Sequence, residues 1–221
     1  NEDEFFNQLT MKLFNYRKFY DKDSLSINDI GDDPLEFFKK WFKDAENSNG
    51  IIEPNAMTIS TVENNVPSSR VVLLKEIKDR SLVFFTNYNS NKGRAISNNP
   101  NLCASFYWPP LERQVIFKGT AKKSNENYSD SYFSSRPINS QAAAIVSQQS
   151  QVIETYEELL DRYNKFLNQN KDLTLKRPDN WGGIELSIKE IEFWQGRENR
   201  LHNRIICYLT NDSWNIQILS P

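Results

Sequence analysis

Apolar residues recur with helical spacing in the first part of this chain, then with strand-like spacing, then again with helical and finally again with strand-like spacing. Asp33 and Pro34 begin the first strong helix, because an aspartate suits the N-cap and a proline suits the first turn. The apolar residues that follow have helical spacing and form one stripe: Leu35, Phe38, Trp41, Phe42 and Ala45. Residues 2–20 read as a polar helix or arm that precedes this helix.

From Ala56 onward, short runs rich in apolar residues, divided by turn-like sequences, are typical of strands. They predict strands over residues 56–62, 69–77, 81–86, 102–108, 113–123, 183–195, 203–210 and 213–219. Between these strands, helices are predicted at 92–98, 125–134, 139–147 and 154–168, and a polar loop is predicted at 169–180.

This order of elements predicts an α+β fold built around an antiparallel sheet or barrel with peripheral helices. Alternating βαβ units and a G-x-G-x-x-G motif are missing, which argues against a Rossmann fold. We expect an N-terminal arm over residues 1–33 and a single domain over residues 34–221.

Charge and composition narrow the classes of partner. The chain has 27 basic and 29 acidic residues, so its net charge of −2 gives no general attraction to nucleic acid or membranes. No apolar run approaches the ~18 residues of a membrane span, and the N-terminus lacks the pattern of a signal peptide. A cytoplasmic protein is therefore expected, with Cys103 and Cys207 as buried free thiols in apolar runs.

The segment 191–204 carries the only histidine of the chain among several arginines. In an extended backbone, Arg200, His202 and Arg204 would project to the same side. Three basic groups on one strand face repel one another unless an anion lies between them. The segment is therefore a candidate anion site with a titratable group at its centre, and a solvated strand face is the alternative.

Four sequence blocks occur in one order from the middle of the chain to its end. They are S-S-R-V-V-L-L-K at 68–75 with V-F-F-T-N at 83–87, L-E-R-Q-V at 111–115, Y-F-S-S-R-P-x-x-S-Q at 132–141 with S-Q-Q-S at 147–150, and I-E-F-W-Q-G-x-x-x-R-L-H-N-R at 191–204. Together they resemble the pyridoxine (pyridoxamine) 5′-phosphate oxidase family. The resemblance implies an FMN-binding split β-barrel, antiparallel and Greek-key-like, that forms a homodimer with flavin in clefts between subunits.

The resemblance also implies an activity and a set of partners. The activity is oxidation of pyridoxamine or pyridoxine 5′-phosphate by O₂ to pyridoxal 5′-phosphate and hydrogen peroxide, with FMN as cofactor and with neither a metal, nucleic acid nor a membrane as partner. Another split-barrel flavoprotein reductase or oxidase is one alternative. A flavin or pyridoxal-phosphate binding protein without turnover is the other.

Several residues are expected to contact FMN because they align with the family's flavin contacts. They are Arg70, Val71, Val72, Leu73, Leu74, Lys75, Phe85, Thr86, Asn91, Lys92, Gln114, Gln149, Ser150, Trp194 and Arg204. Guanidinium and ammonium groups suit phosphate, and a glutamine amide can both donate to and accept from the flavin ring edge. Without the resemblance, Arg70 and Lys75 could be solubilising ends of an apolar strand, Gln114 an outward polar residue, and Trp194 a core residue.

A second set is expected to bind the substrate. It comprises Arg17, Tyr20, Lys75, Tyr132, Arg136, Ser140, Arg200 and His202. Helical spacing places the phenol, guanidinium and hydroxyl of Tyr132, Arg136 and Ser140 on one side, although an ordinary polar helix end is the alternative. Arg200 and His202 are the expected catalytic residues, with His202 able to exchange a proton near neutral pH.

Three positions depart from the family pattern. Asn91 stands where an arginine is common, so the flavin phosphate would lose one charge, for which Arg94 could partly substitute. Asn203 stands where the family has an aspartate, which could change the pKa of His202 or the orientation of Arg204. Phe85 replaces a frequent tyrosine, a loss of little consequence if the backbone makes that contact.

Overall fold

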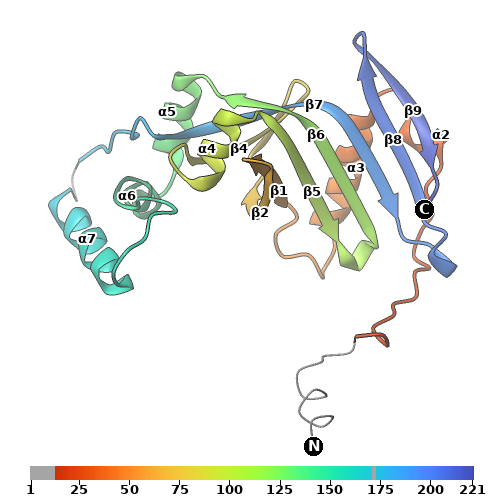
Figure 1. Ribbon diagram of the computed structural model, residues 1–221, viewed down its shortest axis with the longest axis horizontal. Coiled ribbons are helices and arrows are strands. Elements are labelled where there is room, and N and C mark those ends of the chain that lie inside the picture. Colours follow the sequence, from red (N-terminus) through yellow and green to blue (C-terminus); the bar gives the residue numbers. More distant parts are fainter. Residues whose placement is uncertain (1–12, 171–172) are drawn as a thin grey trace, which may run out of the picture.

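The computed structural model describes residues 13–170 and 173–221 (Figure 1). Its helices are α2 (Ile27–Ile30), α3 (Pro34–Glu46), α4 (Asn91–Asn98), α5 (Glu126–Ser135), α6 (Ile138–Val146) and α7 (Tyr156–Gln169), with short 3₁₀ turns η1 (Pro109–Leu111) and η2 (Glu198–Arg200). Its strands are β1 (Ala56–Glu63), β2 (Val66–Leu73), β3 (Glu76–Lys78), β4 (Ser81–Asn87), β5 (Asn101–Trp108), β6 (Arg113–Lys123), β7 (Trp181–Gln195), β8 (Asn203–Thr210) and β9 (Ser213–Leu219).

The strands form one antiparallel sheet in the order β2-β1-β5-β6-β7-β4-β3. Outside this order, β8 pairs with β7, and β9 pairs with β8. The long strand β7 joins the two parts of the sheet. Its first half pairs with β4, its second half pairs with β8, and its other edge pairs with β6. The predicted antiparallel α+β fold is confirmed.

The two ends of this strand order are consecutive in the chain, because only Leu74 and Lys75 separate β2 from β3. Leu74 N–H donates to Asn55 O at 2.8 Å, whereas Lys75 N–H donates to Val83 O at 2.8 Å. The chain thus crosses here from pairing beside β1 to pairing with β4, which curls the sheet into a split barrel. The prediction of one strand over 69–77 is wrong, because this crossing divides it.

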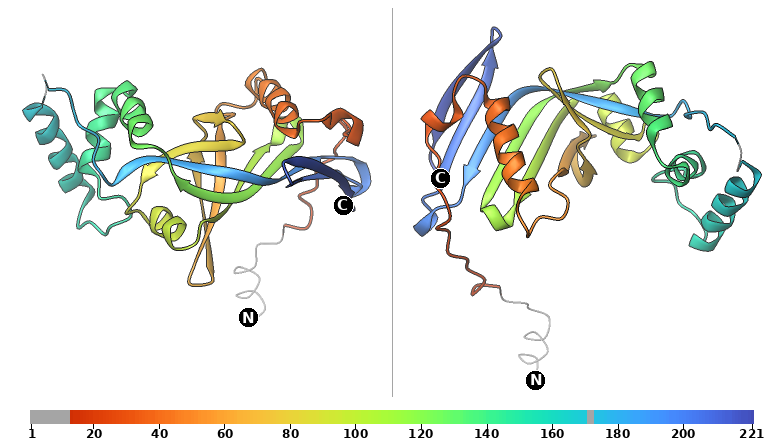
Figure 2. Two further views of the ribbon diagram at one scale, coloured as in Figure 1. Left: turned by 90° about the horizontal axis from the view of Figure 1, so that it is seen from above. Right: turned by 180° about the vertical axis from the view of Figure 1, so that it is seen from behind.

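Helix α3 covers one face of the sheet (Figure 2). Asp33 caps it by accepting a hydrogen bond from Leu35 N at 2.9 Å, as the sequence predicts. Phe38 is fully buried and meets Phe117 of β6 at a ring-centroid distance of 4.8 Å and Phe106 of β5 at 5.2 Å. The predicted apolar stripe therefore forms the main core, in which burial of each large side chain stabilises the fold by about 1.5–3 kcal/mol.

Helices α5, α6 and α7 lie at one end of the molecule, away from β8 and β9 (Figure 1). A separate small cluster holds them to the sheet and comprises Phe133, Ala142, Leu175 and Trp181. Residues 13–20 at the other end form an arm without helix, and the rest of the predicted 2–20 helix or arm lies outside the described residues.

Both cysteines are free thiols, as expected, and Cys207 is buried whereas Cys103 is only half-buried. Burial raises the pKa of the Cys207 thiol to about 12. None of the helices within residues 13–170 and 173–221 is long and apolar enough to cross a membrane.

Candidate functional site

The first candidate site is a cavity of about 500 Å³ at the end of the sheet that carries α5 and α6. Eleven residues expected to bind flavin or substrate line it: Val71, Val72, Leu73, Lys75, Phe85, Thr86, Lys92, Tyr132, Arg136, Ser140 and Gln149. Asn87, Pro137 and Trp181 complete the lining. The fold thus gathers the predicted strand and helix residues at one place.

Three cationic side chains face this cavity, namely Lys75, Lys92 and Arg136, and no acidic residue lines it. Within residues 13–170 and 173–221, none of the three has a carboxylate within ion-pair distance. Lys92 is buried and Arg136 is partly buried, whereas Lys75 is exposed. Burying a cation without a partner is costly, so the cavity has the charge of an anion site.

Lys92 lies in the first turn of α4, which Ser90 caps by accepting a hydrogen bond from Gly93 N at 3.3 Å. Its ammonium donates to Thr86 Oγ1 at 3.2 Å and to Ser90 Oγ at 3.4 Å, and the side chain is only 8% exposed. Burial, and then the positive charge of Arg70, lowers the pKa of Lys92. A bound anion would relieve both effects.

Arg136 follows the last residue of α5 and lies over the indole ring of Trp181, with its guanidinium carbon 4.6 Å from the ring centroid. Its Nη1 is buried and has no hydrogen-bond partner among the described residues. Although α5 ends before Arg136, Tyr132 and Ser140 still line the same cavity. An unpaired guanidinium nitrogen beside a phenol and a hydroxyl fits a phosphate.

Four expected residues lie near this cavity without lining it. Asn91 N–H donates to Ser150 Oγ at 3.3 Å, at the start of α4. The Arg70 guanidinium donates to Thr61 Oγ1 at 2.7 Å on β1, and Leu74 is buried in the core. Arg94 donates to Asn91 Oδ1 at 2.8 Å, so this arginine is adjacent to the position where the family pattern has one.

The second candidate site is a cavity of about 570 Å³ at the opposite end of β7. It is lined by Tyr16, Arg17, Lys18, Phe19, Tyr20, Arg197, Asn199, Arg200 and His202. Four of these residues were expected to bind substrate, from the arm and from the C-terminal segment. The tertiary structure therefore brings together two regions that are far apart in sequence.

His202 is held in one orientation at this cavity. Its Nδ1 accepts a hydrogen bond from Arg197 N–H at 3.0 Å, and its ring lies 4.7 Å from that of Trp194 and 5.4 Å from that of Tyr20. Burial, and then the charge of Arg200, lowers the pKa of His202. The neutral ring is thus favoured, with its proton on Nε2.

The expectation that Arg200, His202 and Arg204 share one strand face is wrong. Asn199 and Arg200 have positive φ angles of 56° and 62°, so the backbone turns and β8 begins only at Asn203. Arg204 then donates from Nε to Glu192 Oε1 at 2.8 Å instead of facing the cavity. Of these three residues, only Arg200 and His202 line the cavity.

Gln114, Trp194 and Arg204 form a row across β6, β7 and β8, because each is the direct partner of the next in register. Direct partners in antiparallel strands project to the same face. This row lies on the sheet outside the linings of both cavities, with Trp194 touching the second cavity through His202.

The sequence reasoning missed Trp181, which stacks under Arg136, as well as Glu112, Arg113 and Arg197, which hold the arm. Glu112 and Arg113 stand inside the L-E-R-Q-V block, so the block itself was the available signal. Within the described residues, no group of three or more histidine, cysteine or acidic side chains could hold a metal ion.

Two family models cover most of the chain. Residues 44–170 match the model for pyridoxamine 5′-phosphate oxidase. Residues 181–221 match the model for the pyridoxine 5′-phosphate oxidase C-terminal dimerisation region.

Relatives and solved structures agree with these models. The pyridoxine/pyridoxamine 5′-phosphate oxidase of Flavobacterium psychrophilum is 49% identical in a match that covers 95% of this chain and 99% of the relative. The enzyme of the same name from Flavobacterium johnsoniae is 48% identical in a match that covers 94% of this chain and 98% of the relative. The crystal structure of PhzG from Burkholderia lata 383, in complex with tetrahydrophenazine-1-carboxylic acid, superposes with a TM-score of 0.83, at 27% identity over 90% of this chain and 98% of that one. A pyridoxamine 5′-phosphate oxidase-related, FMN binding protein from Nostoc punctiforme shares the fold at a TM-score of 0.67, with 13% identity over 83% and 97%. The chain therefore belongs to the pyridoxine/pyridoxamine 5′-phosphate oxidase family of enzymes, as its sequence blocks predict.

Proposed function

We propose that this protein is an FMN-dependent oxidase that converts pyridoxamine or pyridoxine 5′-phosphate to pyridoxal 5′-phosphate. Oxygen is reduced to hydrogen peroxide, and with the amine substrate a water molecule supplies the aldehyde oxygen while ammonia is released. The observation that carries the proposal is the first cavity, where Lys75, Lys92 and Arg136 face one space without acidic partners among the described residues. Phosphate groups are the common feature of the cofactor and of both substrates.

The residues present fit FMN. Lys92 is a buried cation at the start of α4, and helix N-termini favour phosphate. In this proposal the segment 70–75, which comprises the end of β2 and the crossing to β3, would hold the cofactor together with Phe85, Thr86, Asn91, Lys92, Gln149 and Ser150. The chemistry that FMN supplies when bound is acceptance of a hydride from the substrate and reoxidation by O₂.

The same cavity would hold the substrate phosphate through a different group of side chains. Arg136 offers an unpaired Nη1, and Tyr132 and Ser140 add hydroxyl groups. Each charge-assisted hydrogen bond to a phosphate oxygen would contribute about 1.5–3 kcal/mol. Lys75, which also lines this cavity, would add a further positive charge.

Neither cavity is complete on its own. The first supplies phosphate-binding groups, whereas the second supplies His202 and Arg200. Trp181, at one end of β7, lines the first cavity, and β7 runs from there toward the second cavity. This strand has fifteen residues, so its length is about 45 Å at ~3.3 Å per residue. A single small substrate cannot reach both cavities of one chain, so the active site would combine the first cavity of one subunit with the second cavity of its partner.

This homodimer would also bring Gln114, Trp194 and Arg204 of one subunit to the flavin held by the other. The match of residues 181–221 to a dimerisation region supports the arrangement. In a two-fold symmetric dimer the same contact occurs twice, so each dimer would contain two composite sites.

His202 would act in the composite site as a hydrogen-bond donor. Because Nδ1 already accepts from Arg197 N–H, the neutral ring carries its proton on Nε2 and can donate it to a substrate oxygen or nitrogen. Arg200 would fix the substrate and balance negative charge. Holding the reacting carbon in a fixed orientation is the main contribution that these groups make to the rate.

The reaction is tested by an oxidase assay on purified protein supplied with FMN. Each of the two phosphorylated substrates is added in turn, and aldehyde and hydrogen peroxide are measured together. Equal amounts of both products are expected with at least one substrate. Bound flavin without either product would contradict the oxidase and favour a binding protein.

The composite site is tested with a heterodimer of two impaired chains, Arg136→Ala and His202→Ala, which carry different affinity tags, are purified through both and are assayed at substrate concentrations well below the wild-type KM. One of its two sites combines both changes and the other has neither, so about half of the wild-type activity per dimer is expected. If each chain held a complete site, the heterodimer would be as impaired as either parent.

A further inference from the structure

Residues 18–22 of the N-terminal arm bind the body of the protein at one buried carboxylate, that of Glu112, and Lys18 Nζ also donates to Pro109 O at 3.2 Å. Glu112 follows η1, has a left-handed backbone with φ of 56°, and is 1% exposed. One of its carboxylate oxygens accepts hydrogen bonds from Asp21 N–H at 3.1 Å and Lys22 N–H at 3.2 Å, and the other pairs with Lys18 Nζ at 3.1 Å.

All these partners belong to the arm. Within residues 13–170 and 173–221, the Glu112 carboxylate makes no hydrogen bond or ion pair to the body of the protein. A buried carboxylate is costly unless it is hydrogen-bonded, so the arm and Glu112 stabilise each other. Without the arm, the buried Glu112 carboxylate would have no partner and would destabilise this end of the sheet.

The segment that Glu112 holds places Tyr20 at the second cavity. The Tyr20 ring meets those of Trp194 and His202 edge-on, at centroid distances of 5.8 Å and 5.4 Å. Arg17, just before the held segment, lines the same cavity. Two cavity residues, Tyr20 and Arg17, are thus direct chain neighbours of the residues that the Glu112 carboxylate binds.

Gly196 is an independent indication that the Tyr20 ring occupies a defined position, because only a glycine leaves room for it there. A Cβ atom at Gly196 would lie 2.5 Å from the Tyr20 ring, too close for the ring to remain in place, whereas its distance of 3.1 Å to Glu112 Cβ requires only a small shift. Gly196 N–H also donates to Glu112 O at 2.8 Å. The absent side chain leaves the space in which the tyrosine ring lies.

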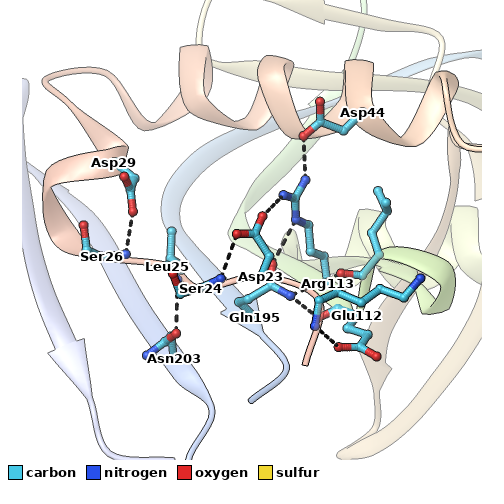
Figure 3. A network of polar contacts seen from close by, with 12 residues as sticks. Asp23, Ser24, Leu25, Ser26, Asp29, Asp44, Glu112, Arg113, Gln195 and Asn203 are labelled. Carbon is cyan, nitrogen blue, oxygen red and sulfur yellow. Dashed lines mark hydrogen bonds and ion pairs between the residues drawn. The ribbon is translucent and has the colours of Figure 1, made fainter. Parts of the chain in front are cut away.

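Further contacts fix the arm beyond Lys22 (Figure 3). Arg113 pairs with Asp23 at 2.7 Å and with Asp44 of α3 at 2.6 Å, and Leu25 N–H donates to Asn203 Oδ1 at 3.1 Å. These contacts hold residues 23–25 whatever Glu112 does. Loss of the Glu112 carboxylate would therefore release the part of the arm that carries Tyr20 while residues 23–25 stay attached.

We propose that Glu112 is a positioning residue of the active site, which holds residues 18–22 so that Tyr20 and Arg17 face His202 and bind the substrate. This inference rests on the proposed oxidase function. Glu112 does not touch the reacting atoms and acts only through the arm. It should therefore affect substrate affinity more than the rate of the bound complex.

The experiment compares Glu112→Ala, Glu112→Gln and Gly196→Ala with wild type, each saturated with FMN. We expect Glu112→Ala to raise KM at least about tenfold, the loss of roughly one charge-assisted hydrogen bond, with a smaller change in kcat. Glu112→Gln keeps an oxygen acceptor for the two N–H groups and should restore most of the affinity. Gly196→Ala displaces Tyr20 with the carboxylate intact and should also raise KM.

Two readouts are independent of turnover. Affinity for added pyridoxal 5′-phosphate should fall in parallel with KM. Trypsin should cut faster after Arg17, Lys18 and Lys22 in Glu112→Ala than in wild type, because the arm is released. Glu46→Gln, at an exposed pair with Lys43 on α3, is the matched control and should behave as wild type.

Unchanged KM, product affinity and trypsin cleavage in Glu112→Ala would overturn the proposal. Equal loss of kcat, flavin and thermal stability in all three variants would overturn it as well, because that pattern indicates a general structural role. If wild type itself lacks oxidase activity, the proposed function fails. The trypsin comparison would then still show whether Glu112 holds the arm.

Discussion

Arg136 lies over the indole of Trp181 with its guanidinium carbon 4.6 Å from the ring centroid. The two residues come from the end of α5 and the start of β7. Stacking on an aromatic ring fixes the plane of a guanidinium and therefore the directions in which its N–H groups can donate hydrogen bonds. The buried Nη1 without a partner among the described residues is one of them.

Arg136→Lys should therefore weaken substrate binding although the charge is kept. A lysine can neither stack on Trp181 nor offer the planar fork, so we expect KM to rise about 10- to 100-fold with a smaller effect on kcat. Steady-state kinetics with both substrates measure this. Arg80→Lys, which changes an exposed pair with Asp212, is the control and should leave KM unaltered. An equal KM in Arg136→Lys and wild type would exclude the proposed phosphate contact.

His202 is the only histidine of the chain, so its pKa can be read from a single imidazole signal in a tag-free protein. Burial and Arg200 lower this pKa below 6.5, so the neutral ring should persist at pH 7. As pH falls through the lowered pKa, protonation on Nδ1 breaks the hydrogen bond from Arg197 N–H, and kcat/KM should fall with it.

An NMR titration together with a pH–rate profile checks this expectation. The two curves should share the same midpoint, and His202→Gln should lose that acidic limb. A pKa above 6.5, or a rate that is constant while the ring titrates, would show that neutral His202 is not the active form.

Asn203→Asp should raise the pKa of His202 relative to the pKa in the wild-type protein. Asn203 Oδ1 accepts a hydrogen bond from Leu25 N–H, and an aspartate can accept the same bond, so the arm should stay in place. The added negative charge next to His202 favours the imidazolium. The same NMR titration measures the shift. Asn215→Asp, an exposed change on β9 with equal net charge, should shift the signal less.

Lys92 should make the affinity for FMN depend on pH in the alkaline range. Burial and Arg70 lower its pKa below 10.5, so part of Lys92 loses its charge as pH rises through that lowered value. A bound phosphate favours the charged form and raises the pKa, so binding in this range takes up a proton and FMN affinity falls with increasing pH.

Calorimetry between pH about 8 and about 10, in buffers of different ionisation enthalpy, measures this proton uptake. Lys92→Arg keeps its charge throughout this range and should bind FMN with little pH dependence. If wild type and Lys92→Arg show the same dependence on pH, another group is responsible.

Local elements could be predicted well from sequence because their signals are local. The cap at Asp33, the apolar stripe of α3 and every strand run except that over 69–77 appear where expected. The strand predicted over 69–77 could not be divided correctly, because the break after Leu73 depends on a change of pairing partner from β1 to β4. Arg200 was misplaced because its left-handed backbone leaves no signal in an R-x-H-x-R spacing.

The elements, the family and most of the residues that line the first cavity could be predicted from sequence, since short blocks carry this information. Which of these residues meet depends on the fold. The fold places Lys75, Lys92 and Arg136 at one cavity and Arg200 and His202 at the other, and it brings the Tyr20 ring to 5.4 Å from that of His202. Such contacts depend on packing between residues far apart in the chain, and spacing along the sequence does not encode them directly.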